Sequence, residues 1–188
     1  MAGMKERMLR GELYLANDPE LVADLARAQE LQERYNATPH AAPAERDLLL
    51  RELLGEVGDG VVVRSPFRCD YGRNISIGPG TFVNYGCVIL DVVPVRIGAH
   101  CQLASSVQLL AATHPLDPEA RRDGWEYGEP ITIGDNVWLG GGVIVCPGVT
   151  IGDDTVVGAG AVVTRDLPAG VVAVGNPARV LREFGHEG

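Results

Sequence analysis

The sequence is poor in aromatic and basic residues. Aromatic residues make up 5% of the 188 residues, and 16 Lys and Arg stand against 25 Asp and Glu, which gives a formal net charge of −9 at pH 7. This negative charge argues against a nucleic-acid backbone or an anionic membrane surface as a partner. An anionic cofactor would therefore need a local basic patch.

Paired cysteines and long apolar runs are also missing. The four cysteines, which are Cys69, Cys87, Cys101 and Cys146, form no C-x-x-C pair and have no neighbouring His at zinc-site spacing. Neither disulfides nor a metal site is predicted, and we expect small buried hydrophobes instead. Residues 1–15 contain no apolar run long enough for a signal peptide or a membrane span, which favours a cytoplasmic protein.

Large aliphatic residues recur every six positions from about residue 57 onward. The unbroken series is Ile133, Leu139, Val145, Ile151, Val157 and Val163. Glycine often follows the aliphatic residue, which suits tight corners. Each hexad predicts a short strand and a corner, and three hexads predict a triangular coil whose strands pair with those about 18 residues later. The spacing predicts an all-β main domain, a parallel β-helix, but does not give its handedness.

The repeat is bounded and interrupted by segments of other kinds. Residues 1–56 carry apolar residues at helical spacing, and prolines divide them into three predicted helices. The β-helix is predicted at 57–177 and a C-terminal extension at 178–188. Two extra residues interrupt the hexads around Val92, and residues 110–130 have no aliphatic spacing. The latter range predicts a protruding loop.

Several stretches together resemble a known family. They are MLRGELY, FRCDYGRNISIG, ATHPLDPEARRDG, PITIGDNVWLGGGVIVCPGVTIG and GAGAVVTRDLPAGVVAVGNPARVLRE. In sequence and order they resemble the maltose and galactoside O-acetyltransferases of the hexapeptide-repeat superfamily, along nearly the whole chain. The resemblance implies a left-handed β-helix, transfer of an acetyl group from acetyl-CoA to a sugar hydroxyl, and a homotrimer with sites between subunits.

The resemblance also implies roles for single residues. His114, in the T-H-P stretch, corresponds to the general base, a role that the pKa of imidazole suits. Asp70, Asn84 and Asp91 correspond to the acceptor-binding region, and His114 and these residues are expected in one subunit. An acceptor-contacting Asp of the galactoside enzymes is shifted or lost near Ala16 and Asn17, which leaves the acceptor's identity open.

The resemblance places acetyl-CoA along the C-terminal coils. The implied contacts are Trp138, Gly141, Ala159, Thr164, Arg165, Arg179 and Arg182. The three arginines supply the basic patch that the phosphates of the cofactor require. Gly141 stands where galactoside enzymes have serine, so an oxyanion contact is expected from its backbone N–H.

Other functions fit the same scaffold. A γ-class carbonic anhydrase needs three His ligands, and the β-helical region contains only His100 and His114, which disfavours that class. A non-catalytic β-helical scaffold stays open, as does an acetyltransferase with another acceptor, such as an antibiotic or an amino sugar.

Overall fold

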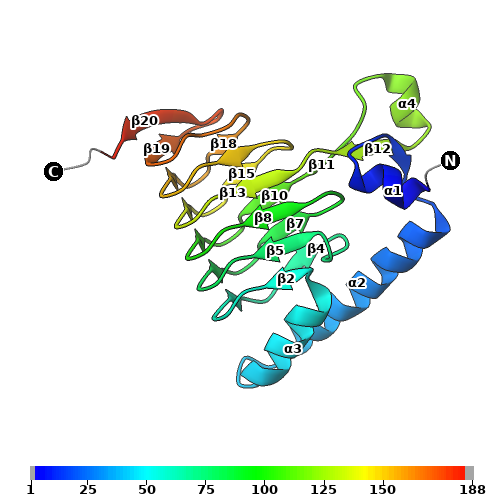
Figure 1. Ribbon diagram of the computed structural model, residues 1–188, viewed down its shortest axis with the longest axis horizontal. Coiled ribbons are helices and arrows are strands. Elements are labelled where there is room, and N and C mark those ends of the chain that lie inside the picture. Colours follow the sequence, from blue (N-terminus) through cyan, green and yellow to red (C-terminus); the bar gives the residue numbers. More distant parts are fainter. Residues whose placement is uncertain (1–2, 185–188) are drawn as a thin grey trace.

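The computed structural model describes residues 3–184, most of which wind into a triangular parallel β-helix (Figure 1). The first sheet contains β2 (Glu56–Val57), β5 (Ile75–Ile77), β8 (Val95–Ile97), β13 (Ile131–Ile133) and β16 (Thr150–Ile151). The second contains β3 (Val62–Val63), β6 (Phe82–Val83), β9 (Gln102–Leu103), β14 (Trp138–Leu139), β17 (Val156–Val157), β19 (Val171–Val174) and β20 (Arg179–Glu183). The third contains β4 (Arg68–Cys69), β7 (Val88–Leu90), β10 (Gln108–Leu110), β15 (Ile144–Val145) and β18 (Val162–Val163).

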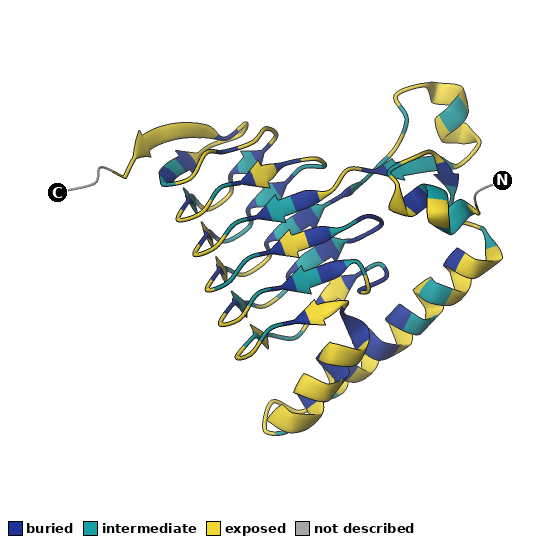
Figure 2. Ribbon diagram, viewed as in Figure 1, coloured by how far each residue is buried: buried dark blue, intermediate teal, exposed yellow. Residues whose placement is uncertain are grey.

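The core of the β-helix consists of stacked aliphatic residues from equivalent positions of successive coils. Ile97 pairs with Ile133 and Ile133 with Ile151 along the first sheet, and each is at most 3% exposed. Figure 2 shows buried and more exposed residues alternating along the strands. Because side chains in a strand alternate between its faces, every second residue points into the prism. The predicted parallel β-helix is confirmed.

The coils differ in length, as the two extra residues around Val92 predict. Ile133 pairs with Ile151, 18 residues later, whereas Ile77 pairs with Ile97, 20 residues later. The early coils have wider turns between the third and first sheets, at residues 70–74 and 91–94. The buried carboxylate of Asp91 accepts backbone N–H bonds within this turn, which explains how the longer corner is held.

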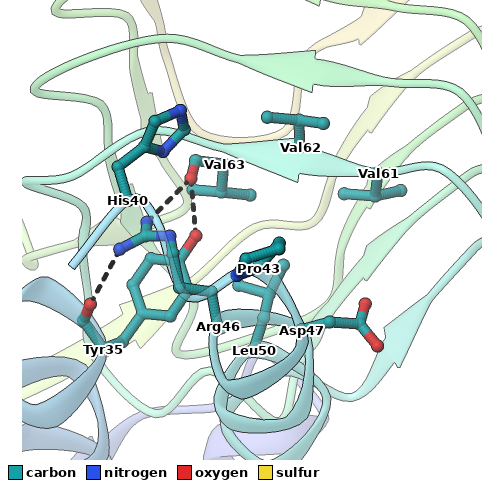
Figure 3. A pocket seen from close by; sticks show the side chains of 9 residues that line it. All are labelled: Tyr35, His40, Pro43, Arg46, Asp47, Leu50, Val61, Val62 and Val63. Carbon is teal, nitrogen blue, oxygen red and sulfur yellow. Dashed lines mark hydrogen bonds between the residues drawn. The ribbon is translucent and has the colours of Figure 1, made fainter. Parts of the chain in front are cut away.

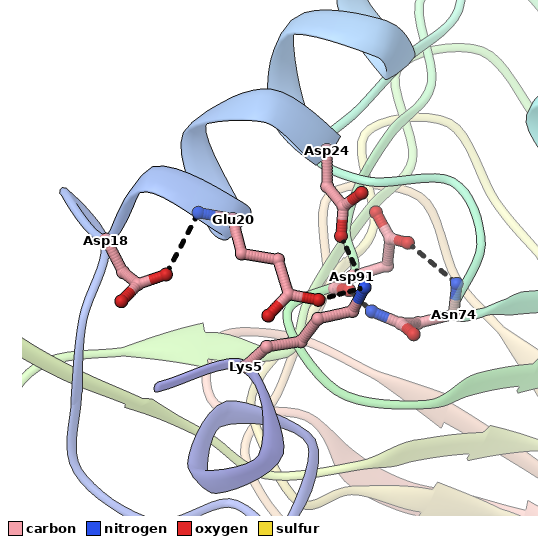
Figure 4. Close-up of polar contacts among 6 residues, drawn as sticks. All are labelled: Lys5, Asp18, Glu20, Asp24, Asn74 and Asp91. Carbon is pink, nitrogen blue, oxygen red and sulfur yellow. Dashed lines mark hydrogen bonds and ion pairs between the residues drawn. The ribbon is translucent and has the colours of Figure 1, made fainter. Parts of the chain in front are cut away.

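Three helices precede the coils: α1 (Met4–Leu9), α2 (Pro19–Ala37) and α3 (Pro43–Leu53). Asp18 caps α2 by accepting the Glu20 N–H at 3.0 Å, and Pro19 suits the first turn. Lys5 of α1 forms ion pairs of 3.0 Å with Glu20 and 2.8 Å with Asp24 (Figure 4). None of the helices among the described residues is both long and apolar enough to cross a membrane.

The buried side chain of Arg46 connects the helices to the first coil through hydrogen bonds. Its guanidinium donates to the backbone carbonyls of Tyr35, Thr38 and Val63 at 2.9 to 3.2 Å and to Ser65 Oγ at 2.9 Å. It also lies over the Tyr35 ring, 4.2 Å from its centroid (Figure 3). Since acceptors surround the charge, its burial is compensated, and these hydrogen bonds link α2 and α3 to the first coil.

The protruding loop leaves the β-helix after β10 and re-enters at β13. It contains β11 (Ala112–Thr113), α4 (Pro118–Arg122) and β12 (Trp125–Gly128). β12 pairs antiparallel with β11 on one side and with β1 (Tyr14–Leu15) on the other. The N-terminal segment therefore contributes a strand to the base of the loop (Figure 1).

Candidate active site

His114 directly follows β11, at the start of the loop, and is exposed. On its N-terminal side Thr113 is in register with Tyr127 of β12. On its C-terminal side the Pro115 carbonyl accepts a 2.9 Å hydrogen bond from Arg121 Nη1. Ordered backbone on both sides thus presents an accessible imidazole next to the β-helix.

Asp70 and Asp91 share a corner with His114. This corner joins the third sheet to the first and is called the His114 corner; it also contains Thr164 and Arg165 after β18. The loop leaves from the same corner, so its base lies beside the wide turns of the earlier coils. The structure therefore brings the predicted base and Asp70 to one edge of the prism.

Asp91 is fully buried, and this corrects its expected role. Its Oδ1 accepts the backbone N–H groups of Asp70 at 3.1 Å and Tyr71 at 2.9 Å, and its Oδ2 accepts that of Asn74 at 3.2 Å. Figure 4 shows Asp91 and Asn74 facing each other across this turn. Burial raises the pKa of Asp91 to about 7. Because no part of Asp91 is exposed, we assign it to positioning Asp70 rather than to direct acceptor contact.

A second carboxylate, which carries no signal in the sequence, lies near Asp70. Glu126 of β12 accepts a 3.0 Å hydrogen bond from the hydroxyl of Tyr14 in β1. Burial, and to a smaller extent the charge of Glu126, raises the pKa of Asp70 to about 6. Within residues 3–184 neither carboxylate forms an ion pair with a basic side chain. Asp70 and Glu126 therefore lie near each other without an ion-pair partner among the described residues.

Within one chain, Asn84 and His114 lie at different corners of the prism. It follows β6 and precedes β7, at the corner between the second and third sheets, which is called the Asn84 corner. Gly141 and Ala159 occupy this corner in later coils. A strand of the third sheet separates the two corners, a span of roughly 13 Å for four residues. Within one subunit, one side of the prism therefore separates Asn84 from the His114 corner.

Gly141 presents a backbone donor without a protein acceptor. The neighbouring N–H groups of Gly140 and Gly142 donate to Val157 and Ser105 carbonyls at 2.8 and 2.9 Å, whereas that of Gly141 has no acceptor among the described residues. A Cβ at Gly141 would meet only Ser105 O, at 3.6 Å. The N–H of Gly141 therefore keeps its hydrogen-bonding capacity, which an oxyanion contact requires.

The remaining residues predicted to bind the cofactor lie in two places, the second sheet and the His114 corner. Trp138 is 54% exposed on the second sheet, and it pairs with Val156, Val156 with Val172, and Val172 with Arg182. Arg179 lies at the start of β20. A hollow of about 850 Å³ lies between Trp138 and Phe184. An aromatic side chain and two arginines thus lie on the second sheet, while Thr164 and Arg165 lie at the His114 corner.

The described residues offer no arrangement for a metal ion. Nowhere in residues 3–184 do three or more His, Cys, Asp and Glu side chains gather as ligands. The four cysteines are unpaired, three of them buried, and burial raises the pKa of the Cys69 thiol. A raised pKa makes a thiol a poor nucleophile at neutral pH.

Comparison with known proteins defines the class and then the family. The bacterial transferase hexapeptide model matches residues 130–165, and the maltose acetyltransferase hexapeptide capping motif matches residues 7–58. Nodulation protein L of Rhizobium meliloti is 56% identical over 94% of this chain and 96% of its own. The molecule is thus a hexapeptide-repeat transferase.

Solved structures agree along the whole chain. A maltose O-acetyltransferase from Clostridium difficile 630 superposes with a TM-score of 0.96 at 46% identity, covering 98% of this chain and 99% of that chain. A galactoside acetyltransferase in complex with coenzyme A superposes with a TM-score of 0.93 at 38% identity, covering 98% and 92%. The chain belongs to the maltose and galactoside O-acetyltransferase family and is an acetyltransferase with a left-handed β-helix.

Proposed function

We propose that the protein transfers the acetyl group of acetyl-CoA to a sugar hydroxyl, with His114 as general base, at sites shared between the subunits of a homotrimer. The observation that carries the proposal is the division of the site residues between two corners. His114, Asp70, Thr164 and Arg165 lie at one corner, and Asn84, Gly141 and Ala159 at the other. Prisms packed side by side would place the His114 corner of one copy against the Asn84 corner of the next.

The proposed reaction is direct transfer within a ternary complex. The imidazole of His114 accepts the proton of the sugar hydroxyl as the oxygen attacks the thioester carbonyl carbon. The N–H of Gly141 from the neighbouring copy donates to the oxyanion that forms. The carbon–sulfur bond then breaks, and His114 returns the proton to the leaving thiolate. Acetyl ester and free CoA are the products.

Acetyl-CoA is the co-substrate, and the second sheet of the C-terminal coils suits it. The indole of Trp138 offers an exposed apolar surface, and Arg179 and Arg182 supply cations in a chain of net charge −9. Guanidinium groups bind phosphate oxygens through paired N–H donors. Because acetyl-CoA and unpaired thiols both belong to the reducing interior of the cell, we assign the reaction to the cytoplasm.

The His114→Ala variant tests the base. We expect CoA release in the presence of acetyl-CoA and a sugar to fall by about 10²- to 10⁴-fold. His100→Asn is the matched control, because His100 lies at the remaining corner with a φ of 56°, a conformation that Asn tolerates. Acetyl-CoA should still raise the thermal midpoint of both variants. Near-normal transfer by His114→Ala would exclude His114 as the base, and the absence of any acetyl-CoA stabilisation in the unsubstituted protein would favour a non-catalytic scaffold.

An amino sugar is a second candidate acceptor, favoured by one specific observation. The carboxylates of Asp70 and Glu126 lie near each other without a basic partner among the described residues. A protonated amine on the acceptor would supply the missing positive charge. Comparison of glucosamine with glucose, using the wild type and Asp70→Asn, tests this candidate. A preference for glucosamine that Asp70→Asn removes would support it, and equal use of both sugars would exclude it.

A further inference from the structure

A hollow beside Asn84 is not used by the proposed reaction. It has a volume of about 380 Å³ and lies between the α2–α3 connection and the Asn84 corner. Side chains that line it include Asn36, Thr38, His40, Arg64, Ser65 and Tyr85. The lining is thus mainly polar, with one aromatic ring at its edge, next in sequence to the predicted acceptor residue.

Tyr85 is exposed but held in place. The residue is 51% exposed, while its backbone N–H donates to Asn84 Oδ1 at 2.8 Å and its carbonyl accepts the Ser106 N–H at 2.8 Å. The guanidinium carbon of Arg64 lies 5.8 Å from the centroid of this ring and 5.9 Å from that of Phe82. The backbone that carries Tyr85 is therefore fixed, and its ring offers a partly exposed apolar surface beside Arg64.

The two arginines at the hollow differ in what they can offer a ligand. Arg46 already donates to four acceptors in the protein. Among the described residues, the side chain of Arg64 forms hydrogen bonds only with the His40 ring, from Nη1 to Nε2 at 2.7 Å and to Nδ1 at 3.5 Å. Since a guanidinium carries five N–H donors, most donors of Arg64 remain free. They lie beside the Tyr85 ring, where a ligand that stacks on the ring would place its polar groups.

Along the axis of the β-helix, the hollow lies on the N-terminal side of the proposed acetyl site. The proposed acetyl site is at Gly141, after β14, and Asn84 lies after β6, two coils nearer the N-terminus. Arg64 lies after β3, one coil further, and successive coils are about 4.8 Å apart. An acceptor whose reactive hydroxyl faces Gly141 and whose ring contacts Asn84 would extend, if it were longer, into the hollow at Tyr85 and Arg64.

We propose that this hollow is a second acceptor subsite, which takes the next ring of an oligosaccharide. The inference rests on the proposed sugar acetyltransferase function. One face of a pyranose ring is lined by C–H groups and stacks on an aromatic ring, here Tyr85. The hydroxyls at the rim of the sugar accept N–H bonds from Arg64. The preferred acceptors are accordingly oligosaccharides rather than monosaccharides.

Acceptors of increasing length test the proposal. Glucose, maltose and cellobiose are compared by CoA release, so that both α- and β-linked second rings are sampled. We expect kcat/KM for at least one disaccharide to exceed that for glucose by about tenfold in the wild type. The ratio should fall to about one in Tyr85→Ala and persist in Tyr85→Phe, which keeps the stacking surface. Arg64→Gln should lower the ratio to an intermediate value.

Each alternative gives a different result. A wild-type ratio at or below one for both disaccharides, or an unchanged ratio in Tyr85→Ala, would overturn the subsite. If the Tyr85→Ala variant no longer ran at the wild-type size in gel filtration, the Tyr85 ring would contact a neighbouring copy instead of a sugar. The 92% exposed Leu116 in the protruding loop of that copy is an example of such a contact. Failure of the wild type to acetylate any of the three sugars would count against the proposed function itself.

Discussion

The hydroxyl of Tyr14 donates a hydrogen bond of 3.0 Å to Oε2 of Glu126, and the two residues are register partners between β1 and β12. This contact joins the N-terminal segment to the loop that carries His114, across 112 residues of sequence. Tyr14 is buried, and burial together with Glu126 raises the pKa of its hydroxyl. The phenol therefore stays protonated and can act as a permanent donor to Glu126.

Removal of this donor should weaken both the fold and the acceptor site. We expect Tyr14→Phe to lower the free energy of unfolding by about 1 kcal/mol, because Glu126 loses its partner in a half-buried position. The KM for the acceptor should rise more than kcat falls, since Glu126 would no longer be fixed beside Asp70. Urea denaturation and CoA-release kinetics measure the two effects.

Tyr127→Phe is the matched control for that substitution. Tyr127 lies in the same strand, and its hydroxyl has no hydrogen bond to another described residue. Its loss should leave stability within about 0.5 kcal/mol of the wild type, as expected for a site without such a feature. Equal effects of the two substitutions would contradict a specific role for the Tyr14–Glu126 bond.

A shared site predicts that two inactive variants restore activity when mixed. His114→Ala removes the base from one corner, and Gly141→Phe fills the other corner, where the backbone tolerates a Cβ. In randomly mixed trimers, about a quarter of the interfaces combine a native His114 corner with a native Gly141 corner. We therefore expect co-expressed variants to recover about a quarter of the wild-type activity.

Separately purified variants, mixed without exchange of subunits, are the control for that experiment. They should stay inactive. Absence of recovery in co-expressed, size-verified mixed trimers would show that His114 and Gly141 serve the same site within one subunit, against the division between corners.

Asp70 should give amino-sugar acceptors a characteristic pH dependence. Burial and Glu126 raise its pKa to about 6, so the carboxyl is mainly neutral below pH 6 and mainly ionised above it. An amine of ordinary α-amino basicity stays mostly protonated up to about pH 7. The ratio of kcat/KM for glucosamine over glucose should therefore rise between about pH 5 and 7, and contributions of His114 common to both sugars cancel in the ratio. A ratio that rises equally in Asp70→Asn would assign the effect to another group.

The fold was predictable because its signal is local and repeated. The hexads of Ile133 to Val163 specify strand, corner and inward face at once, and each residue of the series is buried. The two residues inserted around Val92 were visible as a break in the hexads. The way in which the wide turn is held was not predictable, because it depends on the buried Asp91 carboxylate and its backbone donors.

The site was predictable only in its separate parts. The hexad phase could have shown that Asn84 and Gly141 belong to the same corner and that His114 belongs to another, since each follows a strand of known order. Tyr14 and Glu126 carried no such signal. Their contact depends on an antiparallel pairing between the N-terminal segment and an aperiodic loop, which only the folded chain reveals.

The arginines of the C-terminal coils should act through the phosphates of CoA. Arg182 lies in the same row as Trp138, so we expect Arg182→Gln to raise the Kd for CoA by about tenfold at low salt, as for a charge-assisted hydrogen bond of about 1.5 kcal/mol. The loss should shrink at high ionic strength, because screening weakens exposed ion pairs. Arg96→Gln is the matched control, since Arg96 is exposed on the first sheet. Titration calorimetry with CoA and 3′-dephospho-CoA identifies the phosphate involved. A smaller loss of affinity for the dephospho form would assign Arg182 to the 3′-phosphate. An equal loss of affinity for both ligands would assign it to the pyrophosphate. An unchanged Kd for both ligands would remove Arg182 from the binding site.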